Sequence, residues 1–209
     1  MRTKTLLLVA AVGAAGSLAL NAQVYSVNAV GYVNVTVPAG QLACLCVPLD
    51  PGAANTVADL LPGLPDGSVV YKFDPASGFD INSLTFGMWS DPSMTLVPGE
   101  GFFLLNGGTE DVTITFVGEV PQGTLTIDLP AGFSLVGSKV PQAGAVSTDL
   151  GLPVEDGDTV YTFDPATGYV ISSFTFGMWP GGEPEVDVAE GFWVSKVNPA
   201  TWTREFSIE

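Results

Sequence analysis

The chain has 209 residues, of which 46% are hydrophobic and only 13% charged, a composition typical of a folded domain and not of a disordered one. Its 22 acidic residues outnumber six basic ones, so phosphate backbones and anionic membrane surfaces are repelled. The sequence has no histidine, which excludes Ser-His-Asp and Cys-His catalytic units and zinc sites built on imidazole. Neutral glycans, cations and other proteins remain as partners.

The first 22 residues have the pattern of a secretory signal peptide. Arg2 and Lys4 precede an apolar run from about Leu6 to Ala15, and small residues follow it. Cleavage fits after Ala19 or after Ala22. The run is too short for a permanent membrane span, and no later stretch of about twenty apolar residues replaces it. We expect an exported protein at an extracellular, cell-surface or periplasmic location.

Two copies of one unit follow the signal peptide. Residues 66–89 match residues 156–179 without a gap, and both end in "TFGMW"; 16 of the 24 positions are identical. Further upstream, "VNVTVPAG" (33–40) corresponds to "LTIDLPAG" (125–132). The predicted organisation is a signal peptide (1–22), a first β-repeat with a lead strand (23–120) and a second β-repeat (121–209). Removing the signal leaves four basic against 22 acidic residues, a formal charge of −18.

Each copy has the pattern of short β-strands joined by turns. A helix is expected only at 55–61, capped by Asn55 or Thr56, with a weaker counterpart near 147–151. "VVYKF" and "TVYTF" are strand segments, and "DPASG" and "DPATG" after them predict tight hairpin turns. The closing segments "VTITFVGE" and "WTREFSIE" predict a last strand in each copy. We expect an all-β fold in which each repeat of about 90 residues is a small antiparallel sandwich or barrel.

The repeated "TFGMW" segments raise the question of core or binding surface. Strand periodicity favours Phe86 and Met88 as core residues. Trp89 and Trp179 stand at strand ends, where each either closes one end of the repeat or stacks on a sugar ring.

Three segments carry a resemblance: "AGFSLVGSKVP", "DTVYTFDPATGYV" and "AEGFWVSK", in that order. They resemble the β-repeats of exported surface and wall-associated bacterial proteins. From "VYSVNAVGYVNVTVPAG" to the C-terminus, the chain is similar to a group of short secreted bacterial proteins of uncharacterised function. This resemblance implies export and a β fold, and it carries no catalytic residues to this chain.

The two cysteines, Cys44 and Cys46, are separated by one residue, so a strand points both thiols to one face. An even pair in an exported protein suggests a disulfide, but a bridge between these neighbours is strained. Three alternatives stay open: two buried free thiols, a strained local bridge, and linkage to another chain.

Acidic side chains supply the remaining candidates. Glu100 and Glu190 occupy the same position in the two copies, and turn carboxylates that accept local backbone hydrogen bonds are favoured over an acid and base pair of a glycoside hydrolase. Calcium is a hypothesis for two acidic loops. Its candidate ligands are Asp66, Glu155, Asp156 and Asp158.

These patterns predict a non-enzymatic, exported structural or adhesive protein of the cell envelope or extracellular matrix. Its expected partners are other envelope or matrix proteins, or glycans, with self-association as a further hypothesis, and it needs no cofactor apart from the calcium considered above. The alternative is a carbohydrate-binding module that stacks sugars on Trp89, Trp179, Tyr169 or Trp202.

Overall fold

The computed structural model describes residues 29–208. The predicted signal peptide lies outside this range. The described chain is all-β, with several antiparallel sheets and one short helix, as the sequence predicts. Residues 30–119 and 123–206 form two halves, and their strands follow one another in nearly the same order. In the part of the chain that the structure describes, no helix is long and apolar enough to cross a membrane.

The first half contains seven strands and the helix. They are β1 (Val30–Val37), β2 (Leu42–Cys46), α1 (Val57–Leu60), β3 (Val69–Asp74), β4 (Gly78–Thr85), β5 (Met88–Trp89), β6 (Gly101–Leu105) and β7 (Val112–Glu119). Helix α1 is capped by Thr56, whose side chain accepts a hydrogen bond from the Asp59 N–H, which agrees with the expected cap.

The second half contains eight strands. They are β8 (Gly123–Leu129), β9 (Gly132–Gly137), β10 (Gly144–Ala145), β11 (Thr159–Asp164), β12 (Gly168–Ser173), β13 (Glu185–Val186), β14 (Gly191–Lys196) and β15 (Ala200–Phe206). The weak helix expected near 147–151 is wrong: this segment forms turns.

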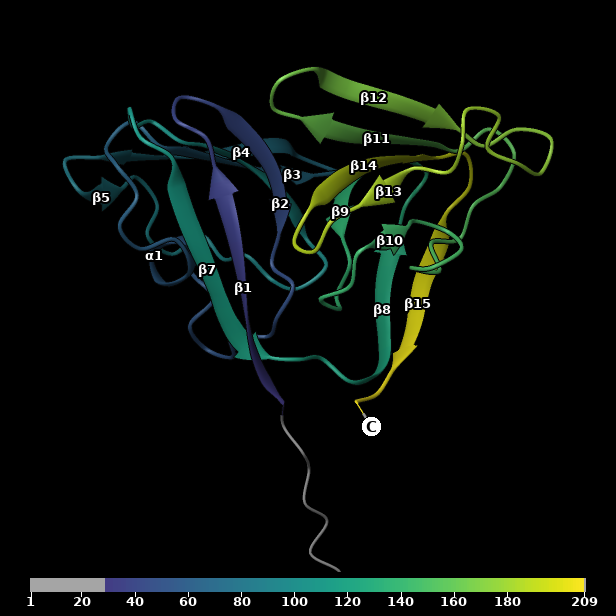
Figure 1. The fold of residues 1–209 in the computed structure, drawn as a ribbon, viewed down its shortest axis with the longest axis horizontal. Helices are drawn as coiled ribbons and strands as arrows, with labels where there is room; N and C mark the ends of the chain where they lie inside the picture. Colours follow the sequence, from purple (N-terminus) through teal and green to yellow (C-terminus); the bar gives the residue numbers. More distant parts are fainter. Residues whose placement is uncertain (1–28, 209) are drawn as a thin grey trace, which may run out of the picture.

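Each half has two layers. A two-stranded ribbon, β1–β7 or β8–β15, packs on a larger sheet of order β2-β6-β3-β4-β5 or β12-β11-β14-β9. The apolar side chains of ribbon and sheet meet in one core per half, around Phe102 and Phe116 in the first and Phe192 and Trp202 in the second. Figure 1 shows the ribbons as two arms that converge where β1 begins and β15 ends, while hairpins β3–β4 and β11–β12 lie on the opposite side.

The hairpin turns have the predicted chemistry. Asp74 Oδ1 accepts hydrogen bonds from the backbone N–H groups of Ala76 and Ser77, and Asp164 does the same in the second half. Gly78 and Gly168 follow with φ of 87° and 84°, a conformation that favours glycine. These hydrogen bonds hold the pKa of both aspartates below the usual range.

The two halves are joined by reciprocal backbone hydrogen bonds. The N–H of Cys46 donates to Ala189 O over 2.8 Å, and the N–H of Gly137 donates to Gly99 O over 3.2 Å. The first bond joins the end of β2 to the loop before β14, and the second joins the end of β9 to the loop before β6. The sheets of the two halves therefore lie in direct contact, and a third apolar cluster around Trp193 fills the space between them.

The "TFGMW" segments are hairpin tips, and the expected burial of Phe86 and Met88 is wrong. Phe86 is 86% exposed and Met88 is 70% exposed. Phe86 and Gly87 form a two-residue turn with φ of 52° and 71°, so the chain reverses before the ring can point inward. Phe176 repeats this conformation, with φ 53° and 90% exposure. Strand periodicity predicted burial because it assumed that the strand continues through the turn.

Candidate functional site

An aromatic cleft of about 480 Å³ opens where the two halves meet. It lies between hairpin β3–β4 of the first half and strands β9, β11, β12 and β14 of the second. Seven side chains line this cleft: Phe73, Phe79, Phe133, Tyr161, Tyr169, Ile171 and Trp193. We call it the aromatic cleft.

Strand periodicity places these rings. In β3 and β11 the alternate residues Val70 and Val160 point into the core of their own half and are fully buried. Phe73 and Tyr161 lie on the opposite face of the same strands, because successive side chains of a strand alternate between its two faces. Both faces of the hairpin strands are therefore apolar, and one of them is turned to the other half.

Trp193 forms the floor of the cleft. It is 9% exposed, and the ring of Phe73, from the other half, packs edge-on against it with centroids 4.7 Å apart. Phe79 and Phe133 stand on its other sides, with centroids at 6.0 and 6.1 Å, both nearly perpendicular to the indole. The indole N–H donates to the hydroxyl of Tyr169 over 3.3 Å, which fixes Tyr169 at the rim.

The walls of the cleft remain open to solvent. Phe79 is 52% exposed, Phe133 49% and Tyr169 50%, so each of these residues has surface free to contact a ligand. A free monomer rarely exposes several large apolar side chains together unless they form an interaction site. Chemically, the cleft offers ring faces for C–H groups and the hydroxyl of Tyr169 at its rim for hydrogen bonds.

Tyr169 is the predicted sugar-stacking residue that the structure places in this cleft. Trp202 lies elsewhere and is corrected as a stacking candidate: it is 2% exposed, packs at 6.0 Å from Phe192 and donates its indole N–H to Leu150 O over 2.8 Å. Its ring has no free face for a ligand.

The strand-end tryptophans close the ends of the two cores. Trp89 packs against the core of the first half and Trp179 against that of the second. The indole N–H of Trp179 donates to Ser147 Oγ over 3.2 Å, and Phe174 packs edge-on at 5.2 Å. Both rings are half-buried, which corresponds to the first of the two interpretations of these positions.

Both cysteines are free, buried thiols at the junction between the halves. Cys44 belongs to the apolar cluster between the sheets, and the thiol of Cys46 lies 3.5 Å from Glu190 O. Burial raises the pKa of Cys46 to about 12 and that of Cys44 well above its usual value. Neither thiol is placed to reach another chain.

The calcium candidates have structural partners. Asp66 and Asp156 each accept the backbone N–H of the glycine in a hairpin tip, over 2.7 and 2.8 Å. Glu155 accepts from the side chain of Asn198 over 2.9 Å. Asp158 is fully buried in an ion pair with Lys196 and is corrected as a ligand, because its carboxylate faces a cation of the chain itself.

The two matched glutamates line separate pockets. Glu100 pairs with Lys72 over 2.9 Å. Glu190 has no such lysine; burial raises its pKa, and the charges of Asp187 and Asp164 add to this shift. Both carboxylates also accept a local backbone N–H, from Val97 and from Asp187, which agrees with the favoured interpretation.

Sequence reasoning missed the centre of the cleft. Trp193, Phe79 and Phe133 lie in strands, and nothing local distinguishes them from core residues. One signal was available: in "TVYTF" and "GFWV" apolar residues occupy both alternating faces, which predicts a second covered or binding face.

No protein-family model matches the chain, and comparison with curated proteins and with solved structures finds no significant match.

Proposed function

We propose that this chain is an exported, non-enzymatic adhesive protein that binds neutral polysaccharide in the aromatic cleft. The observation that carries the proposal is the set of half-exposed rings around Trp193, held by strands of both halves. Rings fixed by edge-on packing lose little conformational entropy on binding, which favours affinity.

Neutral sugars fit this site by their chemistry. A pyranose presents C–H groups on its faces, which stack on aromatic rings, and hydroxyls at its edges, which can hydrogen-bond to the hydroxyl of Tyr169 at the rim. The charge of the chain selects against polyanions, because the chain has 22 acidic residues against six basic ones and no basic side chain is among the residues that line the cleft.

The proposal includes the organisation of the chain. Residues 23–120 and 121–209 are two homologous β-repeats, each a small antiparallel sandwich, which a signal peptide (1–22) directs to the cell envelope or extracellular matrix. The constant offset of 90 residues between matching hairpins and the reciprocal hydrogen bonds at the junction support the duplication. A joint between two repeats then creates a cleft that neither repeat has alone.

The test is binding to soluble neutral polysaccharides, namely β-glucan, xylan and mannan, by affinity electrophoresis and isothermal titration calorimetry. Tyr169→Ala and Phe79→Ala each remove one exposed ring, and we expect about a 3- to 10-fold loss of affinity for each. Both residues are about half exposed, and Phe79→Ala removes no hydrogen bond. Tyr169→Ala also removes the acceptor of the Trp193 indole N–H, so thermal denaturation checks that this variant stays folded.

Tyr32→Ala is the matched control, because Tyr32 is an aromatic residue on β1 that is 74% exposed and outside the cleft. Equal binding by this variant and the unmodified protein supports the assignment. Retention of polygalacturonate but of none of the neutral polymers would contradict it.

A further inference from the structure

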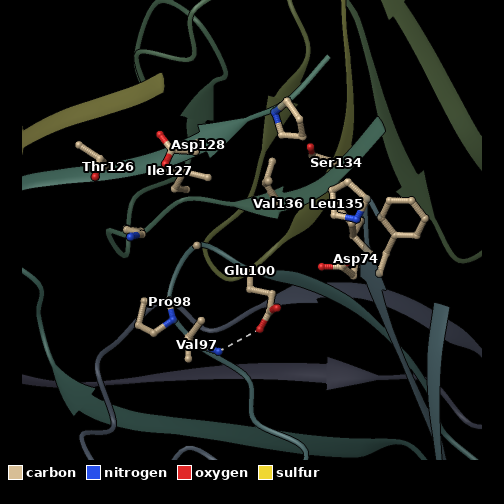
Figure 2. A pocket seen from close by; sticks show the side chains of 15 residues that line it. Asp74, Val97, Pro98, Glu100, Thr126, Ile127, Asp128, Ser134, Leu135 and Val136 are labelled. Carbon is tan, nitrogen blue, oxygen red and sulfur yellow. Dashed lines mark hydrogen bonds between the residues drawn. The ribbon is translucent and has the colours of Figure 1, made fainter. Parts of the chain in front are cut away.

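A second pocket, of about 320 Å³, adjoins the aromatic cleft. Phe73 lines both, and the pocket continues past its ring between the loop before β6 and strands β8 and β9. Figure 2 shows β9, with Ser134 and Val136, facing the loop that carries Glu100. The aromatic cleft is lined by apolar and aromatic side chains, whereas this pocket is also lined by charged and polar residues: Asp74, Glu100, Asp128, Ser134 and Lys139.

Ser134 is the first sign that the pocket is built for a ligand. It is 4% exposed, and in the part of the chain that the structure describes its Oγ is the buried side-chain oxygen or nitrogen without a hydrogen-bond partner. Buried hydroxyls are paired in most proteins, because an unpaired one loses its hydrogen bonds to water and gains nothing. Ser134 lines the pocket, so a ligand group that enters beside it can supply the partner that its Oγ lacks.

Lys139 is the second sign. Among residues 29–208 the other three cations have partners: Lys72 pairs with Glu100, Lys196 with Asp158, and Arg204 donates to Asp149 O. Lys139 has neither an ion pair nor a hydrogen bond within the described residues. Its stem packs on Gly99, where an added Cβ would lie 2.8 Å from Lys139 Cε. Lys139 thus lines the pocket with its stem packed on Gly99, and its ammonium group has no partner among residues 29–208.

The carboxylates set the class of ligand. Asp74 keeps a low pKa through the hydrogen bonds from Ser77 and Ala76, and Asp128 accepts from Thr201 Oγ1 over 3.0 Å. Two carboxylates outside any ion pair repel an anion, and Lys139 repels a cation. Acceptors and donors side by side fit a neutral group that both donates and accepts, which is the hydroxyl of a sugar.

We infer that this pocket is a polar subsite that binds the hydroxyls of one sugar residue of a chain whose neighbouring residue stacks in the aromatic cleft; this rests on the function proposed above. Ser134 and Lys139 donate to the sugar, and Asp74 and Asp128 accept from it. Phe73 separates the two subsites, so the ligand spans at least two sugar units.

The other half carries an altered counterpart of this pocket, of about 270 Å³. Ala43 pairs with Leu104 there as Ser134 pairs with Val194, so alanine stands at the serine position. Cys46 and Gly137 occupy matching places in the two sheets. Two residues further on, the first half has Pro48 where the second half has Lys139. The counterpart thus lacks both unpaired donors, and we assign one polar subsite per chain.

The test is titration of the full chain with cellohexaose, xylohexaose and mannohexaose by calorimetry, with ¹⁵N chemical shifts to locate the bound sugar. Ser134→Ala is expected to weaken binding of the preferred hexasaccharide about 3- to 10-fold and Lys139→Met about 10-fold. Neither change is expected to lower the melting temperature, because neither removes a hydrogen bond of the free protein.

Ser138→Ala is the matched control. Ser138 is also buried, but its Oγ accepts the N–H of Val140 over 3.2 Å and lies outside the pocket. It is expected to lose stability and keep affinity, the reverse of Ser134→Ala.

The outcomes separate the two proposals. If Tyr169→Ala weakens binding while Ser134→Ala and Lys139→Met bind as the unmodified protein does, the subsite is overturned and the cleft stands. If the unmodified protein binds none of the three hexasaccharides, both proposals fall.

Discussion

Two highly exposed residues, Phe86 and Phe176, adopt a backbone conformation that is unfavourable for a bulky side chain. Phe86 and Phe176 have φ near 50°, a region that a bulky side chain adopts at a cost of about 1–2 kcal/mol, and both rings are nearly fully exposed. In each turn the glycine N–H donates a hydrogen bond to an aspartate carboxylate, Asp66 in the first half and Asp156 in the second. Exposed rings in an unfavourable conformation contribute little to the stability of the fold.

Phe86→Asn should therefore raise stability. Asparagine tolerates this conformation, and Asn-Gly is the preferred pair for a two-residue hairpin turn. We expect about 1 kcal/mol in the free energy of unfolding, or about 2–4 °C in melting temperature, from thermal denaturation. Phe176→Asn at the matching tip should give the same gain. A loss in both variants would show that the rings make stabilising contacts.

Among the secondary-structure elements, the ends of β11 and β14 carry a buried ion pair that has a neutral counterpart. Asp158 and Lys196 are fully buried together, and Asp158 also accepts the N–H of Val197 over 2.8 Å. At the same places beside β3 and β6 are Ser68 and Asn106, both fully buried; Ser68 Oγ accepts the N–H of Gly107, and the Asn106 amide donates to Val37 O. The same two buried positions are thus occupied by an ion pair in the second half and by neutral hydrogen-bonding residues in the first.

Lys196→Ala should be strongly destabilising, by about 3–5 kcal/mol, because it leaves the carboxylate of Asp158 buried and unpaired. The double variant Asp158→Ser with Lys196→Asn brings in the neutral pair of the first half and should recover most of this loss. Denaturation in guanidinium chloride measures both. If the double variant is as unstable as the single one, the neutral pair depends on its own surroundings.

For the whole molecule, the junction between the halves leaves no room for added atoms at two glycines, Gly101 and Gly191. A Cβ at Gly191 would lie 2.5 Å from Leu45 O, and a Cβ at Gly101 would lie 2.8 Å from Val136 N. These glycines occupy matching positions in β14 and β6, where each strand crosses the first strand of the other half's sheet.

Gly191→Ala should therefore lower stability by about 1–3 kcal/mol, because the two sheets must move apart. Gly181→Ala is the control, since Gly181 has no positive φ and nothing lies within 4 Å of its added Cβ. In calorimetry we expect Gly191→Ala to shift one unfolding transition of the whole chain. Two separate transitions, with only one of them shifted, would mean that the halves unfold independently.

Local chemistry explains how much of this fold could be predicted. The strands around Val70 and Val160, the turns at Asp74 and Asp164 and the Thr56 cap follow from residues that are adjacent in sequence. Phe86 was misjudged because whether a strand continues through Phe-Gly depends on which φ the chain adopts. The cleft was missed because Phe73 and Trp193 are 120 residues apart and meet only when the halves dock.

The reciprocal hydrogen bonds at the junction join the same two places in each half. Contacts in which each partner uses the same patch are also those of an isologous homodimer, and on the proposed duplication we infer that a single-copy ancestor paired with itself across a two-fold axis. A symmetric dimer must carry every site twice. The two sides of one chain are free to differ: one has Trp193, Phe133 and Ser134, and the other has Phe103, Leu42 and Ala43 in their places. When both halves belong to one chain, a binding site can therefore form on one side of the junction without forming on the other.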